Sequence, residues 1–221
     1  MLDFGFYNMD CMEGMKQCPD KCFDLAIVDP PYGKNIANIG KVGGDGGNFK
    51  YEAKQYMPKK WDKEIPDKKY FNELFRVSKY QIIWGGNYFI DYLKSTPCMI
   101  VWDKDNSGNF ADCELAWTNF ETSVRKIKWR WNGMLQQNMK NKEYRIHPTQ
   151  KPVQLYRWLL KNYAKPGDKI LDTHVGSASS LIACEREGFE YVGFEIDKDY
   201  YQDAKKRIER ERAQLTLELQ C

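Results

Sequence analysis

The order of apolar and polar positions along the chain predicts alternating strands and helices. Unbroken apolar runs such as residues 25–28 are typical of strands covered on both faces of a parallel sheet. This run and other short stretches rich in apolar residues predict strands at residues 3–8, 24–29, 80–84, 98–102, about 113–118, 169–172 and 191–197. Helical spacing and long charged stretches predict helices at residues 10–16, 67–78, from 153 to a stop at Gly167, about 179–187, and 198–220. This alternation indicates an α/β fold.

The strand at 24–29 runs into "DPPYG", residues 29–33. Each proline lacks a backbone N–H and pushes its predecessor toward extended geometry, so the segment can neither continue as a helix nor donate to a ladder. Its carbonyl oxygens therefore stay free as acceptors, with the carboxylate of Asp29 beside them. Such a group of acceptors suits an N–H2 group. Taken alone, an Asp-Pro-Pro exit is equally typical of an ordinary turn.

Length and composition limit the class of protein. A chain of 221 residues is long enough for one α/β domain with a full core, and we expect a single domain over residues 1–221. No apolar stretch approaches the roughly 20 residues that span a bilayer. The opening "MLDFGFYNMD" is too acidic and too interrupted for a signal peptide. The seven cysteines are odd in number and include no Cys-x-x-Cys pair, so we expect reduced thiols, no metal site and a cytoplasmic protein.

Positive charge is concentrated in one part of the chain. Residues 125–151 hold eight basic residues and one acid, a net charge of +7, so that with +3 overall the remainder carries −4. Trp129 and Trp131 and several amides lie among these cations. Cations suit phosphates, and amides and aromatic rings suit base edges and faces, so the segment indicates a nucleic-acid contact rather than a merely solvated face.

Two further segments suggest a ligand site. Residues 34–60 contain five glycines and no sustained periodicity, which predicts a mobile loop of the kind that often covers an active site. Near the other end, a strand closes at Asp172, and a small-residue turn, a helix and a second strand ending near Glu195 follow. An acid about twenty residues after such a turn can hold ribose hydroxyls. A P-loop is excluded because no Gly-Lys-Ser/Thr follows the turn, and its single glycine disfavours a dinucleotide fold.

Three motifs together resemble a known family. "DPPYG" (29–33), "HPTQKP" (147–152) and "DTHVGSASS" (172–180) are similar to motifs of the S-adenosylmethionine-dependent DNA amino-methyltransferases, which modify N6 of adenine or N4 of cytosine. Their order, with the catalytic motif first and the cofactor turn last, is similar to the permuted β class. The resemblance covers residues 4 to about 208. It implies a circularly permuted, Rossmann-like class I methyltransferase fold with a mostly parallel, seven-stranded sheet.

The resemblance also implies roles for individual residues. The catalytic residues that it implies are Asp29, Pro30, Pro31 and Tyr32. The cofactor-binding residues that it implies are Asp10, Asp29, Thr149, Lys151, Asp172, Gly176, Ser177 and Glu195. Among these, Glu195 matches the acid on the ribose hydroxyls and Asp10 the acid near the adenine. The turn departs from the family pattern at Ala178, where a glycine is usual, and at His174, where an aromatic residue is usual.

These residues suggest a mechanism. The Asp29 carboxylate and the Pro30 carbonyl would accept hydrogen bonds from the exocyclic amine of a flipped-out base, and Tyr32 would stack on that base. The loop at 34–60 would close over it. Duplex DNA is the expected partner, with residues 125–146 as a short target-recognition segment. The expected DNA-binding residues are Arg125, Lys126, Lys128, Arg130, Gln136, Gln137 and Asn138.

Alternatives to this reading stay open. Asp as the first residue of the tetrapeptide favours adenine, with N4 of cytosine as the alternative acceptor. A catalytically silent DNA-binding subunit of the same fold is an alternative of another class, and a glutamine or RNA methyltransferase is a third. The resemblance makes a homodimer one assembly to expect. Neither a recognition site nor a partner nuclease follows from the sequence.

Overall fold

The computed structural model describes residues 2–34, 41–42, 54–55, 64–106, 111–132 and 135–220. The strands of the central sheet are β1 (Gly5–Tyr7), β2 (Phe23–Val28), β5 (Ser78–Trp84), β6 (Met99–Asp103), β7 (Cys113–Thr118), β8 (Arg125–Lys128), β11 (Lys169–Asp172) and β12 (Glu190–Phe194). The helices are α1 (Cys11–Lys16), α3 (Lys68–Val77), α4 (Val153–Tyr163), α5 (Ser179–Glu187) and α6 (Lys198–Gln220), with a short 3-10 turn η1 (Gly86–Tyr88).

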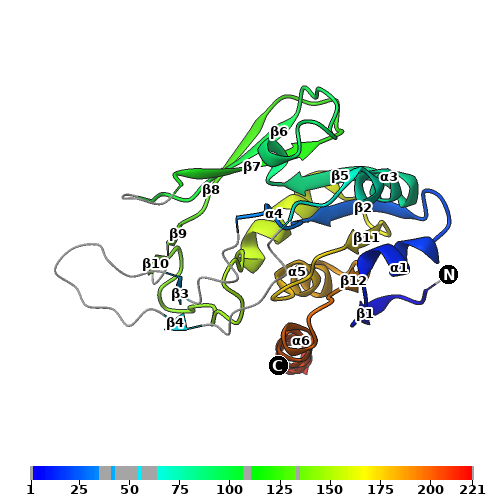
Figure 1. The fold of residues 1–221 in the computed structure, drawn as a ribbon. Helices are drawn as coiled ribbons and strands as arrows, with labels where there is room; N and C mark the ends of the chain where they lie inside the picture. The colour runs from blue at the N-terminus through cyan, green and yellow to red at the C-terminus, as the bar shows by residue number, and fades with distance from the viewer. Residues whose placement is uncertain are drawn as a thin grey trace.

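The central sheet has the order β1-β12-β11-β2-β5-β7-β6-β8. The pairs β1–β12, β12–β11, β11–β2 and β2–β5 are parallel, whereas β7 is antiparallel to both β5 and β6. Blue β2 and yellow β11, which are far apart in the sequence, lie side by side in Figure 1 and pair in register Ile170↔Leu25. The carboxyl ends of β1, β12, β11 and β2 therefore meet at one edge, where ligands of open α/β sheets bind.

Both faces of the sheet are covered by helices. Residues such as Leu25 and Ile27 of β2 belong to a core cluster that includes side chains of α4, α5 and α6. Their neighbours Ala26 and Val28 belong to a second cluster with side chains of α1 and α3. Because successive side chains of a strand point to opposite faces, an unbroken apolar run fits a strand between two helical layers. The fully buried run in β2 confirms that interpretation.

The sheet differs from the prediction in one respect. Seven strands were expected, whereas the described residues form a sheet of eight, because β8 pairs in parallel with β6. Strand β8 consists of residues 125–128, "RKIK", which begin the basic segment. Only Ile127 of this strand is buried, so its pattern lacks the apolar run that reveals the central strands. The remaining predicted strands and helices are confirmed, with ends that shift by a few residues.

Two other segments were predicted from the sequence. In the glycine-rich segment 34–60, β3 (Lys41–Val42) pairs antiparallel with β4 (Lys54–Gln55), and most of the rest lies outside the described residues. The basic segment also contains a second two-stranded sheet, formed by β9 (Trp131–Asn132) and β10 (Leu135–Gln136). Within the described ranges, no helix combines the length and apolar character that crossing a membrane would need.

Candidate active site

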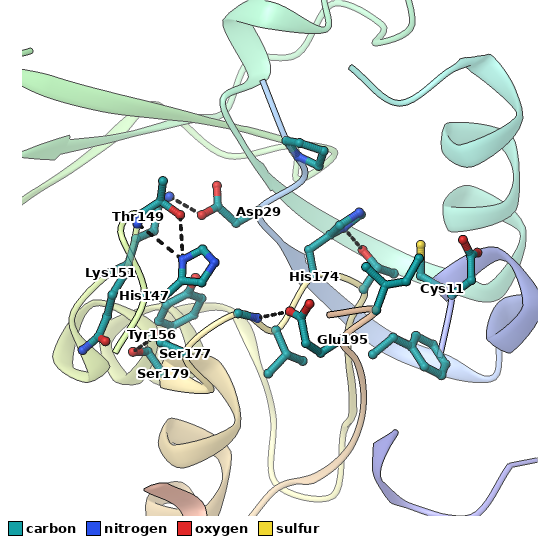
Figure 2. A pocket seen from close by; sticks show the side chains of 18 of the residues that line it. Cys11, Asp29, His147, Thr149, Lys151, Tyr156, His174, Ser177, Ser179 and Glu195 are labelled. Carbon is teal, nitrogen blue, oxygen red and sulfur yellow. Dashed lines mark hydrogen bonds and ion pairs between the residues drawn. The ribbon is translucent and has the colours of Figure 1, made fainter. Parts of the chain in front are cut away.

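A pocket of about 270 Å³ lies at the carboxyl ends of the central strands. This volume is near the lower end of the range for small-molecule sites. In Figure 2, Asp29, Thr149 and Lys151 lie on one side of the pocket, Cys11 and His174 lie on the other, and Glu195 lies between them. The predicted residues that line it are Asp10, Asp29, Pro31, Thr149, Lys151, Gly176, Ser177 and Glu195. Residues from three distant parts of the sequence thus share one site.

The acids from the C-terminal strands are held by backbone N–H groups. Asp172, at the end of β11, accepts from the N–H of His174 at 3.0 Å and from the hydroxyl of Ser180. Burial raises the pKa of Asp172 to about 7. Glu195, just after β12, accepts from the N–H groups of Gly176 and Asp197, each at 2.8 Å. Burial also raises the pKa of Glu195. These acids hold the turn between β11 and α5 in place.

Two residues of the turn between β11 and α5 have a left-handed backbone conformation. Gly176 has φ +54°, and Ala178, in place of the usual glycine, has φ +63° at the start of α5. Placing a Cβ in the left-handed region costs roughly 1–2 kcal/mol. Since Ala178 is fully buried, no larger side chain would fit without rearrangement. The substitution therefore adds strain without changing the turn's left-handed conformation.

His174 fills the position where an aromatic residue was expected. Its ring packs edge-on against Tyr70 with centroids 5.4 Å apart, and its Nδ1 lies 2.9 Å from the hydroxyl of Thr173. Burial lowers the pKa of His174 to about 4, so the ring is neutral at pH 7. It therefore packs as an uncharged aromatic ring. Burial likewise lowers the pKa of His147 to about 3, and this ring lies near Gly176 and Tyr200.

Asp10 begins α1. Its Oδ1 accepts from the N–H of Met12 at 2.7 Å, so the residue caps the helix and also lines the pocket. The other small polar residues of the pocket are close to one another. Thr149 Oγ1 lies 3.1 Å from His147 Nδ1, and Ser177 Oγ lies 3.2 Å from Ser179 Oγ. These contacts leave the hydroxyls with further hydrogen-bonding capacity toward the pocket.

Both carboxylate oxygens of Asp29 have a donor. The hydroxyl of Tyr32 donates to Oδ1 at 2.5 Å, and the ammonium group of Lys151 donates to Oδ2 at 2.5 Å. Each carboxylate oxygen has two acceptor sites, so Asp29 can still accept from a ligand. Pro30 is buried, and Pro31 lines the pocket, as an extended exit from β2 requires. The structure therefore brings together the residues of the "DPPYG" and "HPTQKP" motifs.

Two residues near Lys151, Glu114 and Lys104, were not predicted from the sequence. The ammonium group of Lys151 lies 3.2 Å from Oε2 of Glu114, and Lys104 pairs with the same carboxylate. Burial works to lower the pKa of Lys151, but Asp29 and Glu114 outweigh it and raise that pKa. Burial works to raise the pKa of Glu114, but Lys151 and Lys104 outweigh it and lower the pKa to about 2. Asp29 is thus held by Lys151, which Glu114 in turn holds from its other side.

The predicted DNA-binding cations lie in β8 and just after it. Lys126 Nζ lies 3.4 Å from a carboxylate oxygen of Asp103, and Lys128 Nζ lies 2.7 Å from one of Asp105. Arg130 also pairs with Asp105. Arg125 is exposed and forms no ion pair among the described residues. Two of the four cations therefore share one acid.

The predicted amides take part in hydrogen bonds within the segment. The buried Gln136 bonds through both its amide atoms to the backbone of Glu143. Gln137 accepts from the N–H of Arg130, and Asn138 accepts from two N–H groups in the following turn. The amide N–H2 groups of Gln137 and Asn138 have no partner among the described residues, and these two side chains are exposed.

Comparisons with known proteins agree with the motifs. Residues 116–206 match the sequence family described as DNA methylase. The type II methyltransferase M2.DpnII of Streptococcus pneumoniae is 36% identical over 87 residues, 39% of this chain and 32% of that protein. The type II methyltransferase M.HpaI of Haemophilus parainfluenzae is 37% identical over 71 residues, 32% of this chain and 23% of that protein. The aligned part therefore spans a third or less of the length of these two relatives.

Solved structures match nearly the whole chain. The crystal structure of the M1.HpyAVI–SAM complex has a TM-score of 0.56 and 23% identity, covering 91% of this chain and 98% of that one. The PvuII DNA methyltransferase, described as cytosine-N4-specific, has a TM-score of 0.59 and 12% identity, covering 96% and 91%. These matches confirm the class I methyltransferase fold and, with the sequence matches, the resemblance to the DNA amino-methyltransferases. The circular permutation stays a prediction.

Proposed function

We propose that this chain transfers a methyl group from S-adenosylmethionine to the exocyclic amine of a base in double-stranded DNA, with N6 of adenine as the acceptor. One observation carries the proposal. Asp29, at the end of β2, is held by Tyr32 and Lys151 at the same pocket that Glu195 and the turn after β11 help to form from the neighbouring strands. An acceptor group for an amine thus lies beside a site suited to a nucleoside.

The chemistry of the pocket fits S-adenosylmethionine. Carboxylates of Asp10 and Glu195 can accept hydrogen bonds from the nucleoside hydroxyls and amine, and the left-handed Gly176 allows close approach of the backbone. The carboxylates also favour the positive charges of the sulfonium and ammonium groups. When bound, this cofactor supplies an electrophilic methyl group on sulfur. The SAM complex of M1.HpyAVI supports this choice of cofactor.

Asp29 and its neighbours would orient the acceptor. The lone pair of an exocyclic amine is delocalised into the ring, so the amine is a poor nucleophile. Hydrogen bonds from the amine to Asp29 and to the Pro30 carbonyl would favour a tetrahedral nitrogen and direct its lone pair toward the methyl carbon. Lys151 holds the Asp29 carboxylate on its other side, so little reorganisation is required during transfer. Tyr32 would offer its ring to the base.

Duplex DNA is the proposed substrate. A base inside a duplex cannot reach Asp29, so the target nucleotide would be flipped out. The cations of residues 125–146 would contact phosphates, and the exposed Gln137 and Asn138 would reach base edges. The similarity of residues 116–206 to the DNA methylase family supports a DNA substrate, because the match includes this segment.

The acceptor base decides between two candidates. Asp29 as the first residue of its tetrapeptide favours adenine among related sequences, and this is the basis for proposing N6. The structural similarity to a cytosine-N4-specific enzyme supports the second candidate, N4 of cytosine. Both reactions use the same geometry, because each acceptor is an amine conjugated to the base.

Product analysis tests the proposal. The full chain would be incubated with unmethylated plasmid DNA and S-adenosylmethionine carrying a labelled methyl group, and the digested nucleosides would be identified by mass spectrometry. We expect labelled N6-methyladenine. Labelled N4-methylcytosine would instead support the second candidate. Duplex binding without any labelled base would contradict the enzymatic proposal and support a silent DNA-binding subunit.

A further inference from the structure

A second tyrosine lies against the ring of Tyr32. The turn η1, which follows β5, places Tyr88 so that the two rings stack with centroids 4.9 Å apart and an interplanar angle of 17°. The turn is fixed by hydrogen bonds from Gly85 N–H to Leu115 O and from Tyr88 N–H to Gly85 O, each 2.8 Å. Gly85 has φ +70°, and a Cβ there would lie 2.2 Å from the Tyr32 ring. The backbone is thus shaped to bring the two rings together.

The two rings differ in how firmly they are held. Tyr32 is fixed by its hydroxyl bond to Asp29, by the edge-on ring of Phe89 and by the Gly85 backbone. Tyr88 is 38% exposed, and no hydrogen bond of its hydroxyl is found among the described residues. The next residue, Phe89, is fully buried. Tyr88 is therefore the ring that can move at low cost, while Tyr32 stays in place.

A cation lies beside this pair, close to both rings. The ammonium group of Lys34 is 4.5 Å from the centroid of the Tyr88 ring and 5.8 Å from that of Tyr32. Lys34 is exposed and directly follows the "DPPYG" motif. A flexible ammonium group beside two aromatic faces matches the two parts of a nucleotide, because the rings suit the base and the cation suits the phosphate.

We propose that Tyr32 and Tyr88 are the two walls of a slot for the flipped-out base, with Tyr88 as the movable wall and Lys34 as a contact to the phosphate of that nucleotide. This inference rests on the proposed function. One base between two rings occupies two contact layers of roughly 3.5 Å each. The ring separation of 4.9 Å must therefore grow by roughly 2 Å, which a movement of Tyr88 alone can provide.

The slot also places the base beside the acceptor group. The ring that stays fixed is the one whose hydroxyl donates to Asp29, so a base stacked on Tyr32 lies next to that carboxylate. Tyr88 would then hold the base from its other face and limit its rotation. Alanine in place of a stacking aromatic residue weakens binding of a base by roughly tenfold or more. Tyr88 is thus assigned as a substrate-binding residue.

Three variants at position 88 and one control test the inference. Tyr88→Ala and Tyr88→Leu remove the ring, Tyr88→Phe keeps it, and Tyr80→Ala is the matched control. Tyr80 lies on β5, the strand before η1, is 48% exposed and stacks on Phe120 at 4.7 Å. We expect roughly tenfold or greater loss of kcat/KM for duplex DNA in the first two variants and near wild-type values in the other two. Affinity for S-adenosylmethionine should be unchanged in all four.

A fluorescent base gives an independent readout. In a duplex carrying 2-aminopurine at the position that product analysis finds methylated, Tyr88→Ala should give at least twofold brighter fluorescence than the wild type, because one quenching neighbour is lost. Tyr88→Leu retains apolar volume, so it tests the slot if the alanine variant unfolds. Wild-type kcat/KM and fluorescence in both variants would overturn the slot. Absence of methylation by the wild type would instead overturn the proposed function.

Discussion

The pocket and the basic segment 125–146 both gather charged side chains, but they hold them differently. In the pocket, Lys151 is buried and the Asp29 side chain is only 16% exposed, and each charge has a fixed partner at hydrogen-bond distance. In the basic segment, Lys126 and Lys128 are more than half exposed and pair with Asp103 and Asp105 at the end of β6. Buried pairs are screened little by salt, whereas exposed pairs are screened strongly and exchange partners readily.

This difference fits the two tasks that we propose for these regions. A group that orients an amine must not reorganise during transfer, and a buried network provides that stability. A group that contacts phosphates must release one partner and accept another, and exposed ion pairs worth at most about 1 kcal/mol allow it. The acids near β8 would then occupy the cations until DNA replaces them.

The largest effect is expected at Asp29. Asp29→Asn keeps the size of the side chain but removes its charge, while Glu114 still balances Lys151. We expect methyl transfer to fall by about 10²–10³-fold, the usual effect of removing one preorganised group, with cofactor affinity within a few fold. A transfer assay and equilibrium binding measure the two quantities. Asp24→Asn, at the other end of β2 and paired with Lys79, is the control and should transfer normally.

A second prediction concerns the stability cost of the buried Asp172 beside the pocket. The pKa of Asp172 is raised to about 7 by burial, so the folded protein binds this proton more tightly than the unfolded chain. Wild-type stability should therefore fall, relative to Asp172→Asn, as pH rises from about 4 to about 7, and the difference should be constant above that. The expected change is on the order of 2–4 kcal/mol.

Denaturant unfolding of both proteins between pH 4 and pH 8 measures this change. The exposed Asp91, which lies outside the pocket, provides the control substitution Asp91→Asn. A constant difference between wild type and Asp172→Asn across the whole range would contradict a buried, proton-binding carboxyl. A difference with the opposite slope would mean that the N–H and hydroxyl donors to Asp172 outweigh its burial.

The third prediction addresses cofactor binding. Glu195→Ala removes a carboxylate that we assign to the ribose hydroxyls and that also holds the N–H of Gly176. We expect S-adenosylmethionine binding to weaken by about 1–3 kcal/mol, the cost of stranding hydrogen-bonded partners. Titration calorimetry measures it. Glu190 is exposed at the start of β12, the strand that Glu195 follows, and Glu190→Ala should leave the affinity for S-adenosylmethionine unchanged. Equal affinities for both variants would mean that a residue other than Glu195 binds the ribose hydroxyls.

The pocket was largely predictable because its signals are local. The apolar run before Asp29 marks the end of a strand, and the acids Asp172 and Glu195 follow strands in the same manner. Parallel strands bring these ends together without further information. Glu114 could not be found in this way, because it lies in a strand without a motif and acts only through its contact with Lys151.

The basic segment was less predictable because composition does not reveal partners. The acids that neutralise Lys126, Lys128 and Arg130 come about twenty residues earlier in the sequence. They reach these cations only because β8 pairs with β6, an arrangement that "RKIK" does not signal. Gln136 likewise looks suited to a base edge but is buried, and it stabilises the segment itself. Local patterns predict strands, whereas contacts between distant residues decide which charges are free.

The smallest effect is expected for the ion pairs of β8. If they hold cations that later bind phosphates, removing an acid should strengthen DNA binding. Asp105→Asn releases both Lys128 and Arg130, and asparagine tolerates the left-handed backbone of this residue, which has φ +49°. We expect affinity for all duplexes to rise a few fold at low salt and the slope of log affinity against log salt to steepen by about one unit. Asp112→Asn is the matched control, since it changes the net charge equally at an exposed residue that has no ion pair among the described residues. Fluorescence anisotropy at several salt concentrations measures both. Equal gains in DNA affinity for the two variants would mean that net charge alone causes the effect. If neither variant gained affinity, the phosphate contacts would lie outside β8, because only cations that face the duplex release counterions when they bind.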